Sequence, residues 1–204
     1  MLQLDLAQRP WQDTYKLLSG SILPRPIAFV STVDGKGVAN LAPFSFFTAI
    51  CAEPPLICFA PMRRGSDGAK KDTLCNIEET KEFVVNVVSE SFVTQMNEAA
   101  REFPSNVDEF AVTGLRMIPS IKIQPPRVAE SMIQMECVLE ELLHFGAQEG
   151  GGSLVIGRIL LIHVDETIYE EGRILGEKLQ PVGRLAGHVY TRSFSDTFIL
   201  ERKK

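Results

Sequence analysis

The sequence predicts a mainly β protein, a barrel of short strands with a few helices at its periphery. Runs rich in β-branched and aromatic residues recur at short intervals over most of the chain, and segments with helical spacing are few. A doubly wound α/β sheet would need strands and helices in regular alternation, which this sequence lacks. The 204 residues contain no repeat and no linker-like tract, so we expect residues 1–204 to form one domain.

The predicted strands are apolar runs that end at turn-forming residues. Residues 27–33 form a β-branched run, residues 34–37 read DGKG, and the chain restarts at Val38, so a hairpin is expected there. Further strands are predicted at residues 44–52, 55–60 and 83–88.

Residues 132–145 have two interpretations. The segment is long enough for a helix, but Ile133, Met135, Cys137 and Leu139 alternate with polar residues as in a long strand. After the glycines at positions 150–152, residues 154–164 form a second apolar run. As strands, the two segments would pair as a hairpin.

Two helices are expected beside the strands. Residues 73–81 carry Leu74 and Ile77 three positions apart, and Asp72 and Thr73 are the candidate caps of this helix. Residues 91–102 show helical spacing of their apolar residues, with Ser91 as the expected N-cap.

Composition and charge narrow the class of protein. The net charge of −5 gives no reason to expect nucleic acid or an anionic membrane as a partner. The amino terminus does not resemble a signal peptide, and no apolar run approaches the roughly 20 residues that span a bilayer. Cys51, Cys58 and Cys137 lie in apolar runs and are expected to be buried free thiols. These features predict a protein of the reducing cytoplasm.

The usual catalytic motifs are not found in the sequence. His144 and His163 fall inside predicted strands, where a structural histidine is the more common case, and the only other histidine is His188. There is no nucleophile elbow, no HExxH, no P-loop and no dinucleotide-binding glycine motif. We therefore predict no catalytic residue and no metal site.

Residues 40–48 are a candidate ligand-binding segment. Short polar side chains alternate there with apolar ones, and a flat heteroaromatic ligand needs both kinds of contact. The alternative is an ordinary strand whose serine and threonine face water.

A basic, glycine-containing loop is the second candidate. Its four cations are Arg63, Arg64, Lys70 and Lys71, and the loop leads into the helix expected from Thr73. Cations and free N–H groups at a helix N-terminus favour a phosphate group. The alternative is a solvated basic loop without a ligand.

Together these blocks resemble the flavin reductase-like family of FMN-binding split-barrel proteins, which includes flavoredoxin. The resemblance runs from about Tyr15 to Arg192. It rests on LPRPIAFVST at residues 23–32, NLAPFSFF at 40–47, KDT at 71–73 with Asn76, EFVVN at 82–86 and GRLAGHVY at 183–190.

The resemblance implies a split β-barrel, a homodimer and an FMN site near the subunit interface. It assigns the FMN phosphate to Arg25 and the basic loop, especially Lys71 and Thr73. It assigns the ribityl chain and the isoalloxazine ring to Asn40 and residues 42–48. The implied cofactor-binding residues are Arg25, Asn40, Ala42, Pro43, Phe44, Ser45, Phe46, Phe47, Thr48, Lys71, Asp72 and Thr73. Whether Arg184, His188 and Tyr190 touch the flavin stays open.

The implied activity is electron transfer from NADH or NADPH to the flavin. Hydride passes directly between the two cofactors, so this activity needs no protein acid or base, in agreement with the missing catalytic motifs. The reduced flavin would then serve a monooxygenase or another redox partner. The alternatives are an FMN-bearing electron carrier of the flavoredoxin kind, reduced by a partner protein, and a split-barrel module without a cofactor.

Overall fold

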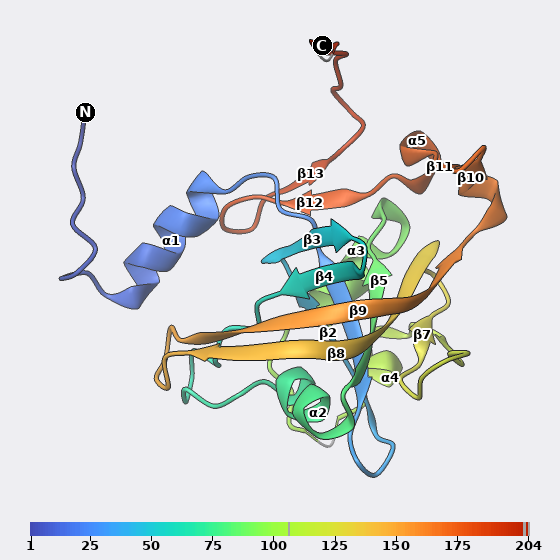
Figure 1. The fold of residues 1–204 in the computed structure, drawn as a ribbon. Coiled ribbons are helices and arrows are strands. Elements are labelled where there is room, and N and C mark those ends of the chain that lie inside the picture. Colours follow the sequence, from blue (N-terminus) through green and yellow to red (C-terminus); the bar gives the residue numbers. More distant parts are fainter. Residues whose placement is uncertain (106, 202, 204) are drawn as a thin grey trace.

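The structure is a computed structural model that describes residues 1–105, 107–201 and 203 (Figure 1). One curved antiparallel sheet dominates it, with strand order β2-β1-β5-β8-β9-β4-β3. Its strands are β1 (Ala28–Val33), β2 (Ala39–Phe44), β3 (Phe47–Ala52), β4 (Pro55–Phe59), β5 (Glu82–Val87), β8 (Ile133–Phe145) and β9 (Gly152–Val164).

Helices and short strand pairs surround this sheet. The helices are α1 (Trp11–Ser21), α2 (Asp72–Thr80), α3 (Val93–Glu98), α4 (Glu109–Thr113) and α5 (Gly176–Leu179), with 3-10 turns at Glu90–Phe92 and Glu166–Ile168. The short pairs are β6 (Met117–Ile118) with β7 (Arg127–Val128), β10 (Tyr169–Glu170) with β11 (Arg173–Ile174), and β12 (Val182–Arg184) with β13 (Tyr190–Arg192). The predicted β-rich class with peripheral helices is confirmed.

The sheet is a barrel that is split between its two edge strands, β2 and β3, which do not pair with each other. Strand β2 lies at one end of the strand order and β3 at the other, yet only Ser45 and Phe46 separate them. The chain turns there, and the carbonyl of Phe46 accepts from the amide of Ala60 at 2.8 Å. The predicted single strand at residues 44–52 is therefore wrong, since its first residues end β2 and the rest form β3.

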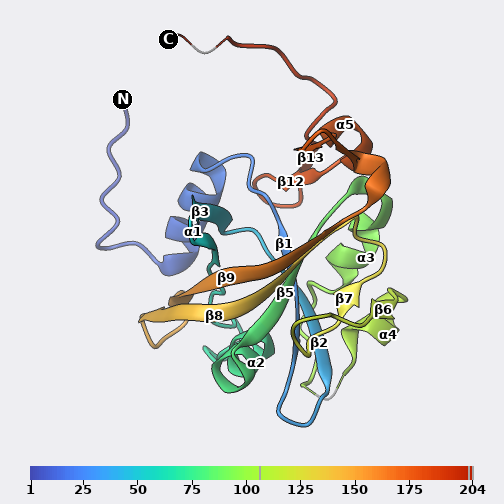
Figure 2. The same ribbon diagram turned by 45° about the vertical axis from the view of Figure 1, so that its right-hand side comes forward.

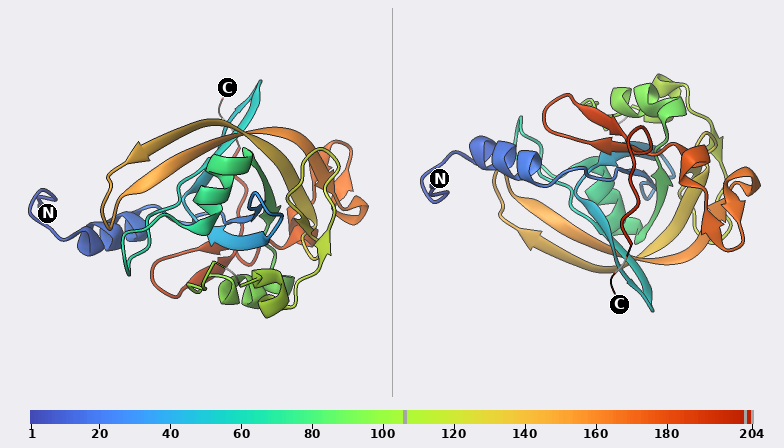
Figure 3. Two further views of the ribbon diagram at one scale, coloured as in Figure 1. Left: turned by 90° about the horizontal axis from the view of Figure 1, so that it is seen from below. Right: turned by 90° about the horizontal axis from the view of Figure 1, so that it is seen from above.

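Two apolar clusters lie on opposite faces of β1, whose six residues are all buried. One packs inside the curved sheet with α2, as seen from below in Figure 3, and its fully buried members include Phe59, Phe83 and Ile77. The other joins the outer face of β1 and β2 to α3 and α4 through Phe29, Phe92 and Phe110. Strand β1 is therefore packed against apolar side chains on both of its faces.

The long segments β8 and β9 form the predicted hairpin, and the strand interpretation of residues 132–145 is confirmed. Their register shifts between Glu136 and Cys137 and again between Leu139 and Glu141. Such irregularities let a 13-residue strand bend around the core instead of running straight (Figure 2).

The helix starts differ from the predicted caps. Lys71 is the N-cap of α2, and neither Asp72 nor Thr73 caps it with a side chain. Ser91 is also not a cap, because it lies inside the 3-10 turn that precedes α3. Three helices were not predicted, α1, α4 and α5.

The predicted burial of the cysteines is confirmed for Cys137 only. Cys58 is half-buried, and Cys51 is exposed because the edge strand β3 leaves the residues after Phe47 uncovered. No helix in the described part of the chain is long and apolar enough to cross a membrane.

Candidate functional site

A groove runs along β2 and the bend that follows it. Three adjoining pockets share Pro43, and together they extend from the start of α2 to β12 and β13. Their lining includes nine of the twelve predicted residues: Asn40, Ala42, Pro43, Phe44, Ser45, Phe46, Lys71, Asp72 and Thr73. Segments far apart in the sequence therefore meet at the split of the barrel.

The four cations of the basic loop have different surroundings. Arg63 donates to the carbonyls of Gly68 and Gly146. Arg64 pairs with Asp72 at 2.8 Å, and Lys70 pairs with Glu78 at 2.6 Å. Lys71 has no such ion pair among the described residues, so it is the cation of this loop that remains for a ligand.

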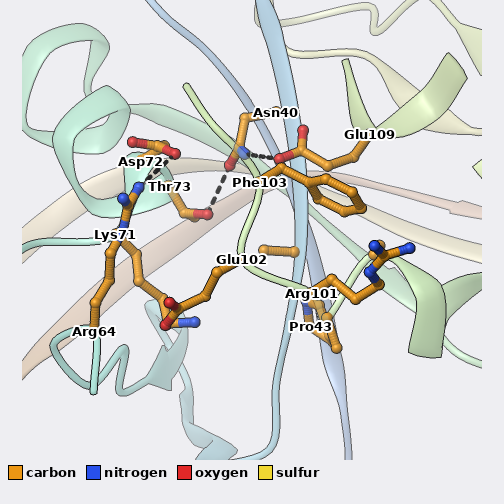
Figure 4. Close-up of a pocket in the computed structure, with 13 residues that line it drawn as sticks. Asn40, Pro43, Arg64, Lys71, Asp72, Thr73, Arg101, Glu102, Phe103 and Glu109 are labelled. Carbon is orange, nitrogen blue, oxygen red and sulfur yellow. Dashed lines mark hydrogen bonds and ion pairs between the residues drawn. The ribbon is translucent and has the colours of Figure 1, made fainter. Parts of the chain in front are cut away.

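The ammonium group of Lys71 is half-buried in the wall of the groove (Figure 4). Burial lowers the pKa of Lys71, while the charge of Glu102 acts against this shift. A partly desolvated cation that makes no ion pair with a carboxylate among the described residues is costly unless a ligand anion neutralises it. This end of the groove therefore favours an anion.

The N-terminus of α2 supplies further donors at the same place. Its first backbone bonds run from the amides of Leu74 and Cys75 to the carbonyl of Lys71. Among the described residues this leaves the amides of Asp72 and Thr73 without an acceptor, and no side chain caps the helix. Free amides at a helix N-terminus, beside a cation, bind phosphate or carboxylate groups.

A buried chain of side chains holds this end of the groove in place (Figure 4). The hydroxyl of Thr73 donates to Asn40 Oδ1 at 2.7 Å, and Asn40 Nδ2 donates to Glu109 Oε1 at 2.9 Å. The second carboxylate oxygen of Glu109 accepts from the amide of Leu41, and burial raises the pKa of Glu109. The hydroxyl proton of Thr73 is thus already donated to Asn40.

Sequence reasoning missed Glu109. It lies 69 residues after Asn40 in a segment where no helix was predicted. The only local sign of α4 is Asp108, whose carboxylate caps the helix by accepting from the amides of Phe110 and Ala111.

Arg25 is placed differently from the other predicted residues. It is 4% exposed, and its guanidinium donates to the carbonyls of Ser19, Ile22 and Leu185 and to Ser45 Oγ. These bonds tie α1 and the segment after β12 to the bend, so Arg25 supports the groove from behind. Phe47 and Thr48 do not line the groove either; Thr48 is exposed on β3.

The far end of the groove is formed by Arg184 and Tyr190, with Met96 and Ala100. Arg184 lies over the Tyr190 ring at 4.6 Å and also donates to its hydroxyl. His188 is exposed in the loop between β12 and β13 and does not line the groove. Tyr15 of α1 closes the groove from the opposite side.

The remaining titratable cluster lies outside the groove. Glu136 is fully buried on β8 and accepts from His163 Nε2 at 2.6 Å, and His144 contacts Ser153 and Glu78. Both histidines thus have protein partners, as expected for structural residues. The described residues contain no group of three or more histidine, cysteine or acidic side chains suited to a metal ion.

Comparison with known proteins defines the class to which this fold and groove belong. Residues 19–183 match the flavin reductase like domain family, and the chain is a member of that family. The predicted resemblance is thereby confirmed.

Solved structures of similar proteins extend this result. The chain is 43% identical to nitrilotriacetate monooxygenase component B from Bacillus cereus, with 98% of each chain covered and a TM-score of 0.92. It is 31% identical to the 2-nitrobenzoate 2-nitroreductase of Pseudomonas fluorescens, over 98% of this chain and 96% of that one, with a TM-score of 0.87. A split barrel domain protein of Shewanella frigidimarina shares the fold at 20% identity, over 99% of this chain and all of that one, with a TM-score of 0.82.

Proposed function

We propose that the chain binds FMN in this groove and that NADH or NADPH reduces the bound flavin. The observation that carries the proposal is the half-buried Lys71, which makes no ion pair among the described residues and lies beside the α2 amides that have no acceptor there. A phosphate monoester satisfies both, because it brings negative charge and several acceptor oxygens to one point.

The rest of the groove fits the rest of FMN. Asn40 and the segment Ala42–Ser45 offer polar groups along the path that a ribityl chain would take from Lys71. Pro43, Met96 and Tyr190 offer apolar and aromatic surface for a flat ring, with the cation of Arg184 beside it. Arg184 would stabilise negative charge that develops on the ring.

The flavin supplies the redox chemistry when bound, by accepting hydride and passing electrons onward. The chain positions it: Lys71 and the α2 amides hold the phosphate end, and Arg25 fixes Ser45 and the bend. Hydride transfer to the flavin does not require a protein acid or base.

A monooxygenase or another redox partner is the proposed recipient of the electrons. The 43% identical protein of Bacillus cereus is a monooxygenase component, which supports this choice. The 31% identical nitroreductase supports reduction of a small molecule as a second route. A cytoplasmic location fits both proposals because NADH and NADPH are available there.

The test is an anaerobic absorbance titration of the purified chain with FMN, followed by NADH or NADPH. We expect a bound-flavin spectrum that bleaches quickly with one of the two donors. A bound flavin that stays oxidised until a partner protein or light reduces it would favour an electron carrier. A chain that leaves the FMN spectrum unchanged would overturn the cofactor assignment.

We also propose that the chain works as a homodimer, and β3 is the candidate contact. This edge strand exposes every residue from Thr48 to Ala52, Ile50 is 47% exposed, and the β3–β4 hairpin projects beyond the barrel (Figure 3). An exposed apolar edge strand is a ready surface for a second chain.

Replacing Ile50 with lysine is expected to shift the chain from dimer to monomer, because it places a charge on that edge. Sedimentation velocity measures the change. Val112→Lys is the matched control, since Val112 is similarly exposed, at 44%, on α4. A dimer that survives Ile50→Lys would exclude β3 from the contact.

A further inference from the structure

The groove divides at Tyr15, and only one of its two branches is used by the proposed flavin site. One branch leads to Arg184 and Tyr190. The other continues past Phe46, Ala60 and Met62 into a cavity of about 520 Å³ between α1 and the turn of the β8–β9 hairpin. Because Tyr15, Phe46, Ala60 and Met62 line both this cavity and the groove, the two spaces adjoin.

The second branch is walled by aromatic and apolar side chains. Trp11 and Tyr15 come from α1, Phe46 from the bend and Phe145 from the end of β8. The rings of Tyr15 and Phe46 lie 6.2 Å apart at an angle of 53°, so they form a corner and not a closed stack. Flat aromatic molecules gain most from such walls.

Trp11 is held in place by the hairpin turn. A side chain at Gly150 would overlap the Trp11 ring, and Gly150 also has a φ of +80°. The indole thus rests on glycine backbone, and one wall of the cavity is fixed by packing and not by a mobile loop.

The charge of this branch is positive. Arg9 is the single charged residue among those that line it, and no carboxylate does so. In a chain with a net charge of −5, this arrangement disfavours a cationic ligand and favours a neutral or anionic one. The positive charge and the aromatic walls together favour a ligand with a planar ring and an acidic group.

We propose that this second branch binds a planar aromatic carboxylate, with the ring between Trp11, Tyr15 and Phe46 and the carboxylate at Arg9. The inference deepens the proposed function and rests on it, since it names the class of small molecule that would lie beside the flavin. Binding itself depends only on the side chains of this cavity, so it is measurable without flavin.

The single tryptophan of the chain makes the site directly observable. The full-length protein, with and without FMN, is titrated with benzoate, and the emission of Trp11 is recorded. We expect a saturable emission change in both states, and weaker binding of the neutral analogue benzamide. Three results would overturn the inference: no saturable change, equal affinity for benzamide, or displacement of FMN by benzoate. If the emission of Trp11 changed with the protein concentration but not with the benzoate concentration, the cavity would instead be assigned to contact with a second copy of the chain.

Two variants separate the roles of charge and shape. Arg9→Gln is expected to weaken benzoate binding about fivefold, the size of a partly exposed ion pair, and to leave benzamide binding unchanged. Arg173→Gln, which removes the same charge from exposed β11, is the control. Thr14→Phe fills the cavity from α1 and should abolish benzoate binding while FMN binding persists. Persistent benzoate binding in Thr14→Phe would place the ligand elsewhere.

These experiments keep the two proposals apart. If FMN binds and benzoate does not, the aromatic site is wrong and the flavin site stands. If benzoate binds and FMN does not, the cavity is confirmed as a binding site, but its role beside a flavin is lost.

Discussion

Replacing Lys71 with alanine is expected to weaken FMN binding roughly tenfold to a hundredfold, with little loss of stability. A hydrogen bond to a charged group contributes about 1.5–3 kcal/mol, and this lysine has no ion pair among the described residues to lose. Removal of a partly desolvated cation also relieves a cost in the ligand-free protein. Quenching of FMN fluorescence on titration measures the affinity.

Lys70→Ala is the matched control for this prediction. It removes the same charge from the neighbouring position, but Lys70 is already paired with Glu78 at 2.6 Å. We expect its FMN affinity to stay within about threefold of the unmodified chain, the range of an exposed ion pair. Equal losses in the two variants would mean that the loop acts only through its overall charge, and two unchanged affinities would move the phosphate away from α2.

Replacing Glu136 with glutamine is expected to lower the free energy of unfolding by about 2–4 kcal/mol, the range for disrupting a buried charged network. Its carboxylate is fully buried and accepts from the amides of Ile121 and Lys122 at 2.8 and 2.6 Å, and from His163 at 2.6 Å. Glutamine offers one acceptor oxygen and turns an N–H group toward these donors. Urea denaturation followed by circular dichroism gives the difference.

The stability lost in Glu136→Gln should depend on pH in a defined direction. Burial alone raises the pKa of Glu136, but the hydrogen bonds from Ile121, His163 and Lys122 outweigh it and hold the pKa below its ordinary value of 4.5. A carboxyl group with a depressed pKa stabilises the fold above its unfolded pKa and loses this contribution as pH falls through the folded pKa. The difference between the two proteins is therefore largest above about pH 4.5 and narrows below it.

Glu140→Gln controls for the loss of a charge on the same strand. Its carboxylate is 43% exposed and pairs with Arg158 at 3.3 Å, so a change within about 1 kcal/mol is expected. If the stability gap of Glu136→Gln were constant from pH 7 to pH 3, the carboxylate would not be the source of the stabilisation.

Much of the barrel could be predicted because strand signals are local. Alternation in residues 133–139 indicated the strand β8, although the length of the segment also allowed a helix, and the DGKG turn placed the hairpin of β1 and β2. The division of residues 44–52 could not be seen in the same way. Ser45 alone is a weak turn signal between two apolar stretches. The chain bends there because β2 and β3 lie at opposite ends of the strand order.

The segments that form the candidate site could be predicted from the sequence, but the contacts among their side chains could not. The sequence singled out the basic loop, yet only the structure separates Lys71 from Arg64 and Lys70, whose partners Asp72 and Glu78 lie on α2. Glu109 and Tyr15 were missed because each reaches the groove from an element without a clear sequence signal. Arg25 was assigned to the phosphate by resemblance, but its side chain is buried and donates to the carbonyls of Ser19 and Leu185. The sequence does not show these contacts.

The bend between β2 and β3 also determines how the two halves of the barrel are mechanically connected. Strand β2 belongs to the half with β1 and β5, and β3 to the half with β4 and β9. Among the described residues, the strand ladders of these halves are joined only through β8, on the far side of the sheet from the bend. On the side of the bend the halves meet through side chains, since the rings of Phe44 on β2 and Phe59 on β4 lie 5.1 Å apart in the same buried cluster. This seam of the barrel is therefore closed by apolar packing and not by a backbone ladder.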